Sequence, residues 1–238
     1  MKQSIAPAQG LFFQNDIAMK KFFRNNSLSI VFFVLFIITL GLQSFTGLKQ
    51  YNQEMKDIGG PQLSVKQYFS SGHFIEATFE NWESEFLQMA LFVTLTMFLY
   101  QKGSSESKDP GKETEEVDRE PDASKKDAPW PVKKGGFFLS AYKYSLSYIL
   151  FLLFFLCFGI HWYGSLHEFN HEQVLKGLPT ESALDYLSNS KLWFESFENW
   201  QSEFLSVVSL AVLSIYFRQK GSPQSKPVDA PNYQTGEG

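Results

Sequence analysis

The sequence contains a single cysteine, Cys157, among its 238 residues. One cysteine cannot form an intramolecular disulfide, and because this one lies inside an apolar run, cysteine usage does not indicate a redox compartment. The chain also lacks an excess of basic residues: its formal net charge is −4 at pH 7, which argues against a general nucleic-acid-binding protein. It contains no phosphate-binding loop, no G-x-S-x-G sequence and no plausible thiol nucleophile.

Apolar residues are concentrated in four long segments, at 27–45, 82–100, 145–163 and 200–217. Trp82 to Tyr100 is 18 steps, or about 27 Å of helix at roughly 1.5 Å per residue, which nearly spans a hydrocarbon core of about 30 Å. The alternative is four buried helices of a soluble bundle, which the first and third segments disfavour because they are apolar on every face. We therefore expect an all-α integral membrane protein with four transmembrane helices.

The distribution of Lys and Arg predicts an orientation. The N-terminal tail, the central loop and the C-terminal tail carry 4, 9 and 3 of these residues, or 16 of 21. By the positive-inside rule, both termini and the central loop are cytoplasmic.

Two nearly identical nonapeptides, FENWESEFL at 79–87 and FENWQSEFL at 197–205, indicate an internal duplication. Their offset of 118 residues aligns 27–108 with 145–226 without a gap, and 30 of the 82 aligned positions are identical. A second shared block follows each helix, QKGSSESK at 101–108 and QKGSPQSK at 219–226. Each half is one out-and-back helical hairpin, so we expect two tandem hairpins related by a parallel repeat.

The repeat divides the chain into five regions. Two hairpins lie at 27–100 and 138–218. The first has helices at about 27–47 and 79–100, and the second has helices at about 142–165 and 197–218. The other regions are a cytoplasmic N-terminal tail at 1–26, a flexible charged cytoplasmic linker at 101–137 and a disordered cytoplasmic tail at 219–238. A short helix is expected after Ser64 and after Ser182, each preceded by a glycine-containing turn.

A polar stripe follows the second helix of each hairpin. On a wheel of 100° per residue, the stripe occupies roughly 80°, and it consists of Asn81, Glu85, Gln88 and Thr96 in the first copy and Asn199, Glu203, Ser206 and Ser214 in the second. Gln43 on the first helix lies at a depth similar to that of Glu85, and His161 takes its place in the second copy. We expect a Gln43–Glu85 and a His161–Glu203 contact, because a carboxylate in hydrocarbon needs a partner.

These stripes have two interpretations. In the first interpretation, the repeated carboxylates form a polar or ion site that binds a cation or passes protons. In the second, they supply interhelical hydrogen bonds and define the start of a helix. Glu80 and Glu198 fit the second interpretation, as acidic residues at a helix start. Interface anchors are also expected, with Trp82 and Trp200 in the aromatic belt and Lys102 and Lys220 at the opposite membrane surface.

The sequence HEFNH at 167–171 matches the H-E-x-x-H zinc pattern. His167 and His171 are therefore weak candidates for metal ligands, with Glu168 as the base. The aligned first-copy residues are KQYNQ, and no third ligand stands at a characteristic spacing. A zinc-dependent membrane peptidase is the remote alternative, and we expect no enzyme activity and no cofactor.

The doubled FENWxSEFL and QKGSxxSK motifs, around a charged loop that ends in PWPVKKGG, resemble a family of uncharacterised bacterial membrane proteins. The resemblance covers roughly residues 20–228 and implies a four-helix layout in the bacterial cytoplasmic membrane. It is a domain of unknown function, so it transfers no catalytic residues. We expect a non-enzymatic structural or interaction protein whose partners are the lipid bilayer and either a second copy or another membrane protein. The alternative is a proton or cation pathway through the repeated carboxylates.

Overall fold

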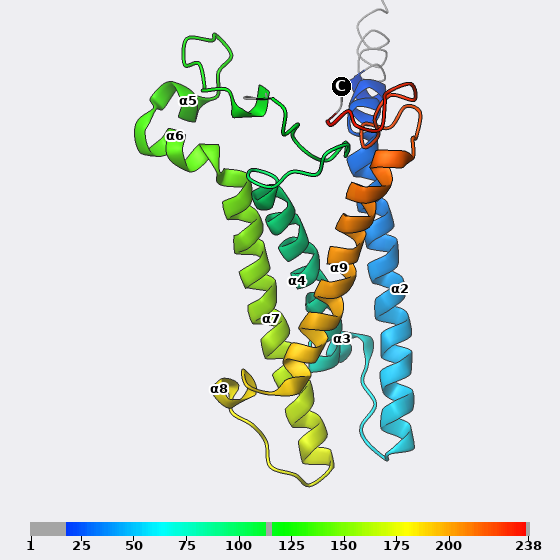
Figure 1. The fold of residues 1–238 in the computed structure, drawn as a ribbon. Coiled ribbons are helices and arrows are strands. Elements are labelled where there is room, and N and C mark those ends of the chain that lie inside the picture. Colours follow the sequence, from blue (N-terminus) through cyan, green and yellow to red (C-terminus); the bar gives the residue numbers. More distant parts are fainter. Residues whose placement is uncertain (1–17, 113–115, 237–238) are drawn as a thin grey trace, which may run out of the picture. The chain divides into compact units, whose positions relative to one another are not determined.

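The computed structural model describes residues 18–112 and 116–236. Every regular element in these residues is helical, as the sequence predicts. The chain forms two compact units, residues 1–69 and 70–238, and each is described by itself (Figure 1).

The described part of the first unit contains one long helix and one short helix. Residues 18–25 are helical, α2 spans Ser27–Asp57 and α3 spans Val65–Tyr68. The turn between α2 and α3 passes through Gly59, whose φ of 71° favours glycine. Asn52 fixes this connection, because its side chain donates to the Leu63 carbonyl at 2.8 Å and accepts from the Leu63 amide at 2.7 Å. A capping box formed by Ser64 and Gln67 starts α3, the short helix expected after Ser64.

Three long helices dominate the second unit. They are α4 at Gly72–Leu95, α7 at Ser145–Leu175 and α9 at Ser190–Tyr216. The shorter elements are the 3₁₀ helix η1 at Glu116–Asp118, α5 at Trp130–Lys134, α6 at Gly136–Lys143 and α8 at Ala183–Tyr186. Helix α4 packs along α7 over most of its length and meets α9 less extensively.

The long helices differ in extent from the sequence expectation. Helices α2 and α7 continue for ten residues beyond the expected ends at 47 and 165, to Asp57 and Leu175. Helices α4 and α9 begin about seven residues earlier than expected, because Ser71 and Asn189 cap them by accepting from the amides of Phe74 and Lys191. These extensions carry residues 72–78 and 190–196 into the helical packing.

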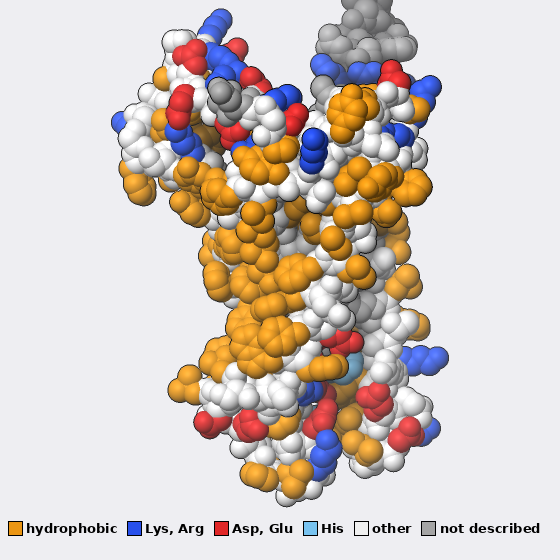
Figure 2. Space-filling view, viewed as in Figure 1, with side chains coloured by type: hydrophobic (Ala, Val, Ile, Leu, Met, Phe, Trp, Pro, Cys, Tyr) orange, Lys and Arg blue, Asp and Glu red, His pale blue; other side chains and the backbone are white. Residues whose placement is uncertain are grey.

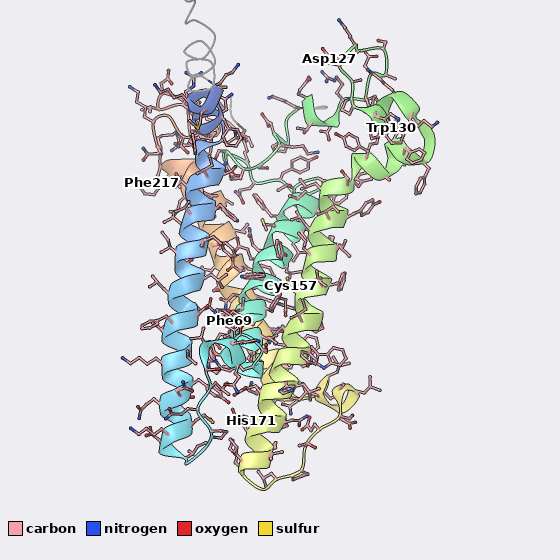
Figure 3. The ribbon with its side chains drawn as sticks, turned by 180° about the vertical axis from the view of Figure 1, so that it is seen from behind. Phe69, Asp127, Trp130, Cys157, His171 and Phe217 are labelled. Atoms are coloured by element: carbon pink, nitrogen blue, oxygen red, sulfur yellow. The ribbon has the colours of Figure 1, made fainter. Side chains whose placement is uncertain are left out.

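Two glycines allow α4 and α7 to approach closely. A Cβ atom at Gly72 would lie 2.5 Å from the backbone nitrogen of Glu168, and one at Gly164 would lie 2.7 Å from the backbone nitrogen of Glu76. Glu168 also accepts a hydrogen bond of 2.8 Å from the His73 amide, so it binds the free N-terminal backbone of α4. Farther along α4 and α7, beyond the buried Glu83 and His161, the buried hydrophobic residues of these helices are Leu87, Ala90, Leu150, Phe154 and Cys157. Cys157 lies about midway along α7 (Figure 3).

Two described helices, α2 and α7, are long and apolar enough to cross a membrane. Hydrophobic side chains cover the exposed middle of α7 (Figure 2). Helices α4 and α9 do not meet the same criterion, because their N-terminal halves carry several acidic residues. The expectation of four spanning helices therefore reduces to two candidates.

The segment after α9 is a series of turns that fold back onto the loop after α4, where a disordered tail was expected. Lys226 is 1 % exposed, and its ammonium donates to the carbonyls of Gly103, Asn232 and Gln234 at 2.5, 3.0 and 2.9 Å. The expected linker 101–137 also contains η1 and α5, and α6 begins at its end and continues into the second hairpin region. Composition did not reveal this order because it rests on backbone carbonyls, which every sequence supplies.

Substituting Gly164 with Ala should reveal how tightly α4 and α7 are packed. The new methyl group would meet the backbone of α4, and overpacking of this kind costs about 1–3 kcal/mol. We expect a lower melting temperature of the purified protein, measured by intrinsic fluorescence. Gly159→Ala is the matched control on the same helix, since its Cβ meets nothing within 4 Å. An equal melting temperature for the two variants would contradict the close packing.

Candidate functional site

A network of charged and polar side chains connects α4, α7, α8 and α9 of the second unit. We call it the charge network, and it comprises Glu76, Glu83, His161, Ser165, Tyr186, Lys191, Glu195 and Trp200. All of these residues lie in the half of the unit that holds the N-termini of α4 and α9.

Glu83 joins three helices. Its side chain, on α4, is fully buried, and its two oxygens accept from His161 Nδ1 of α7 at 2.7 Å and from Trp200 Nε1 of α9 at 2.8 Å. A carboxylate in apolar surroundings is costly unless its oxygens are satisfied. Here each oxygen of Glu83 accepts one hydrogen bond, and one of the two donors, His161, also forms an ion pair with Glu83.

His161 is also fully buried, and both of its ring nitrogens face carboxylates. Nε2 lies 3.2 Å from an oxygen of Glu195 on α9, opposite the Nδ1 contact to Glu83. With an acceptor on each side, both nitrogens donate and the ring carries a positive charge. His161 therefore bridges a carboxylate of α4 to a carboxylate of α9.

Glu195 receives a second set of contacts through Ser165 on α7. The Ser165 hydroxyl donates to Glu195 at 2.8 Å and, because it has one proton, accepts from the Tyr186 hydroxyl at 2.8 Å. Ser165 and Tyr186 are both 0 % exposed. The Tyr186 ring can be buried because its hydroxyl has this polar partner.

Lys191 links two carboxyl groups at the start of α9. Its ammonium pairs with Glu76 of α4 and lies 2.7 Å from Glu195 Oε1. Burial, and then a hydrogen bond from Glu76 to Glu195, raises the pKa of Glu76 to about 9. Burial opposes ionisation of Glu195, but hydrogen bonds from His161, Glu76 and Lys191 hold its pKa at about 2. These two carboxyl groups therefore share one proton, as close acidic pairs do.

Lys191 remains charged throughout the ordinary pH range. Burial alone would lower its pKa, but the neighbouring Glu76 and Glu195 outweigh this effect and raise the pKa above its usual value. Glu76, Lys191 and Glu195 all precede the apolar segments 82–100 and 200–217.

The structure corrects the expected partner of His161. The sequence predicts a contact with Glu203, but His161 binds Glu83 and Glu195. The expected pairings assumed that Gln43 and His161 each contact the second helix of their own hairpin at equal depth. In the structure α7 packs mainly against α4, which belongs to the other hairpin.

The other stripe residues lie outside the charge network. Glu85 is exposed and Glu203 is half-buried, and the charge of Glu85 acts on Glu203, so the two carboxylates lie near one another. Asn81 and Asn199 donate to the carbonyls one turn earlier in their own helices, and Ser206 does so three residues earlier, whereas Gln43 and Gln88 are half-buried. Gln43 belongs to the first unit, so its expected contact with Glu85 remains a prediction.

The expected interface anchors differ in their surroundings. Trp82 is half-buried and stacks on Phe79 at 5.0 Å between ring centroids, whereas Trp200 binds Glu83 in the charge network. Lys102 and Lys220 are exposed, as a lysine at a membrane surface requires.

The HEFNH sequence lies in the C-terminal half of α7, and His171 is labelled there (Figure 3). His167 is exposed and stacks on Tyr163 at 6.0 Å between ring centroids, and His171 is half-buried. Glu168 is buried and occupied by the His73 amide. The residue that the zinc pattern assigns as a base thus caps α4.

A different group has the spacing of metal ligands among the described residues. One ligand atom each of Glu80, His161 and Glu195 lies within 4.8 Å of the others. Sequence reasoning named Glu80 only as a helix-start residue and did not name Glu83, Lys191 or Glu195. A signal was present, because the two copies differ at these places: His161, Lys191 and Glu195 align with Gln43, His73 and Ala77.

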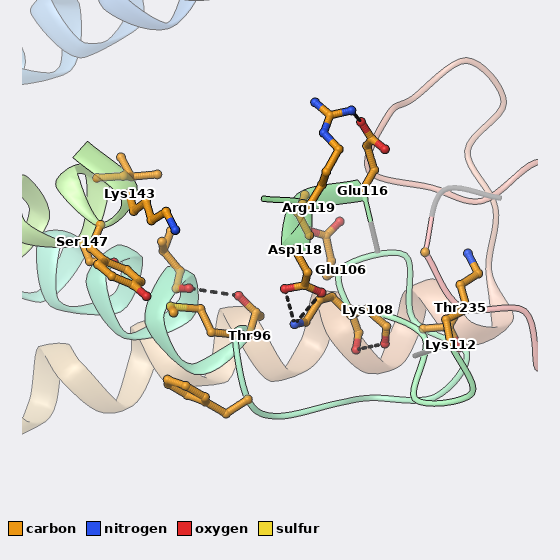
Figure 4. A pocket seen from close by; sticks show the side chains of 18 of the residues that line it. Thr96, Glu106, Lys108, Lys112, Glu116, Asp118, Arg119, Lys143, Ser147 and Thr235 are labelled. Carbon is orange, nitrogen blue, oxygen red and sulfur yellow. Dashed lines mark hydrogen bonds and ion pairs between the residues drawn. The ribbon is translucent and has the colours of Figure 1, made fainter. Parts of the chain in front are cut away.

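A cavity of about 1160 Å³ lies at the other end of the unit, between the linker and the ends of α4 and α7. Its charged side chains mostly pair with each other (Figure 4). Lys108 lies 3.1 Å from Asp118, Lys143 lies 3.0 Å from Glu120, and Arg119 pairs with Glu116 three residues earlier. These pairs leave the cavity without a clear ligand chemistry.

The fold and the charge network define an all-helical protein with two helices that can cross a membrane. The chain belongs to the family described as a domain of unknown function, DUF6766, which matches residues 19–237. No curated protein and no solved structure matches the chain.

The shared proton makes stability depend on pH. Burial raises the pKa of Glu76 to about 9 in the folded protein, whereas the ordinary pKa of a glutamate, which applies to the unfolded chain, is 4.5. The contribution of Glu76 to the free energy of unfolding is therefore complete below about pH 4.5 and is lost as the pH rises towards 9. We expect the melting temperature to fall between pH 5 and pH 9, and to fall less in Glu76→Gln, which mimics the protonated group.

Glu172→Gln is the control for this measurement, because Glu172 forms an exposed pair with Lys176 at 2.8 Å on α7. It should keep the wild-type slope of melting temperature against pH. Equal slopes in wild type and Glu76→Gln would show that Glu76 and Glu195 do not share a proton.

Proposed function

We propose that this chain is a multi-pass protein of the bacterial inner membrane with both termini in the cytoplasm and a non-enzymatic structural or interaction role. Helices α4 and α9 contain 24 and 27 residues, or about 36 and 40 Å at roughly 1.5 Å per residue. Each exceeds a hydrocarbon core of about 30 Å, even though part of its length carries charges. The charge network then lies at the outer membrane surface, with Lys102 and Lys220 at the inner one.

One observation supports the structural role: the charge network joins α4, α7 and α9 at one end of the contact between these helices. Glu83 and His161 bind α4, α7 and α9 together, and the core that follows contains only Leu87, Ala90, Leu150, Phe154 and Cys157 as buried hydrophobic residues of these helices. Protons and cations need polar groups or water along their route. Between α4 and α7 the buried side chains beyond the network are mainly apolar, and the hydrogen bond between Thr94 and Ser147, 3.3 Å long, lies near the far end of α4. This arrangement favours a structural clamp over a proton or cation pathway.

The duplicated architecture supports the same proposal. Asn52 and Asn170, which are 118 residues apart, each bind the amide and carbonyl of the residue eleven positions later. Ser107 and Ser225 likewise each accept from the amide six positions earlier, at 2.9 Å. We infer that the duplication provides two similar hairpin frames whose helix contacts are held by local polar devices.

A proton or cation pathway is the second candidate. It is favoured by the proximity of Glu85 on α4 to Glu203 on α9, since both occupy equivalent positions of the repeat and neither belongs to the charge network. Such a pathway would follow the α4–α9 face rather than the α4–α7 core.

Glu83→Gln tests the clamp. Removing one partner of a buried ion pair costs about 3–5 kcal/mol, because the other charge is left uncompensated. We expect Glu83→Gln to lower the melting temperature strongly and to weaken any assembly seen by light scattering. Glu83→Gln/His161→Gln should recover part of the loss, because the unpaired charge is removed as well. Additive effects of the two substitutions would contradict the clamp.

Flux separates the two candidate functions. Purified protein in liposomes, with an internal pH-sensitive dye and an imposed potential, should give no more proton flux than empty liposomes. A flux that disappears in a folded Glu85→Gln/Glu203→Gln variant would overturn the structural role and establish the pathway. The clamp prediction and the flux prediction can fail independently, so their outcomes are distinguishable.

A further inference from the structure

We propose that Glu80, His161 and Glu195 bind one divalent transition-metal ion, of which Zn²⁺ is the probe. This site goes beyond the proposed structural role and does not depend on it. It also differs from the HEFNH pattern, whose two histidines are not part of it.

The spacing of the three side chains suits a common ion. Their ligand atoms already lie within 4.8 Å of one another. Imidazole nitrogens and carboxylate oxygens bind Zn²⁺ at about 2.0–2.2 Å, so tetrahedral ligands stand roughly 3.4 Å apart. Metal binding would draw these atoms from within 4.8 Å to about 3.4 Å of one another. One imidazole and two carboxylates are ligands for Zn²⁺ and similar ions, whereas Ca²⁺ and Mg²⁺ prefer oxygen alone.

The surroundings of His161 are those of a metal-bound histidine. Such a histidine usually donates its second ring nitrogen to a carboxylate, which fixes the ring and increases its basicity. His161 donates Nδ1 to Glu83 at 2.7 Å, and Glu83 is itself held by Trp200 at 2.8 Å. This arrangement leaves Nε2 directed at Glu195, 3.2 Å away. The fixed histidine therefore presents the nitrogen that the metal requires.

The second ligand, Glu195, is positioned in the same way. Ser165 donates to Glu195 Oε2 at 2.8 Å, while Lys191 occupies Oε1 at 2.7 Å. Lys191 is the only competing cation of the charge network, and it lies on the oxygen that does not face His161. Glu80 is half-buried, so it can serve as the third ligand and as the point of entry.

Charge balance also favours a divalent ion. Four carboxyl groups, those of Glu76, Glu80, Glu83 and Glu195, face one lysine and one histidine. These carboxyl groups outnumber the cationic side chains that face them. A divalent cation bound between Glu80, His161 and Glu195 adds positive charge where carboxylates are in excess, which lowers the cost of their burial.

Metal binding to the full-length protein in lipid nanodiscs tests the site. After treatment with a chelator, the protein is titrated with Zn²⁺ by calorimetry, and bound metal is measured after dialysis. We expect one equivalent per chain. Glu80→Gln should weaken binding at least tenfold, and His161→Gln should do the same. Cobalt substitution should give absorption bands in the visible range, which Glu80→Gln loses.

Glu198→Gln is the matched control, because Glu198 aligns with Glu80 at the offset of 118 residues and is exposed. It should bind Zn²⁺ as the wild type does. The absence of stoichiometric binding in the wild type would overturn the proposal. Binding that is lost in His167→Ala but kept in Glu80→Gln would overturn it equally, since the metal would then lie at HEFNH. Glu80→Gln is the decisive variant because its carboxylate has no part in the Glu83 junction, and circular dichroism would verify its fold.

Discussion

The second unit depends on how Glu83 and His161 are buried together. Each is fully enclosed, and neither could be placed there alone, since a single uncompensated charge in apolar surroundings would cost several kcal/mol. Their pairing satisfies this requirement only when α4, α7 and α9 all reach the same point, because Trp200 supplies the second donor to Glu83. The charge network therefore fixes which helices meet, and the close approach at Gly72 and Gly164 fixes how near they come.

The general architecture could be predicted from the sequence because it depends on strong, local signals. Helices, glycine turns and the Ser64 capping box follow from patterns that span a few residues, and the structure has them. The length of α4 and α9 was underestimated, since their first seven residues precede the repeated nonapeptides and mix polar with apolar side chains, and the capping residues Ser71 and Asn189 show where they begin. Apolar runs locate the middle of a helix better than its ends.

The candidate site was harder to predict because it is formed between the hairpins. Sequence reasoning found His161 and recognised that it needs a carboxylate, but it assigned Glu203 from the same hairpin. The partner depends on whether α7 packs against α4 or α9, and helix periodicity carries no information about this choice. Glu83 could have been found from its difference from Gln201, the aligned residue of an otherwise nearly identical nonapeptide. The prediction concentrated on residues that the two copies share, whereas the ionic groups of the charge network stand mostly where the copies differ.

This contrast separates two kinds of position in the repeat. Residues that form the same local bonds in both halves, such as Asn52 and Asn170, maintain a frame that each hairpin needs. The charge network instead uses Ser165 and Glu195, whose aligned residues are Gly47 and Ala77, and these cannot accept or donate through a side chain. The network therefore combines Glu76 and Glu83 of the first half with His161 and Glu195 of the second, whose aligned residues Gln43 and Ala77 could not form the same contacts. Such an asymmetric junction favours a structural clamp, whereas the alternative pathway rests on Glu85 and Glu203, which occupy equivalent positions and lie outside the network.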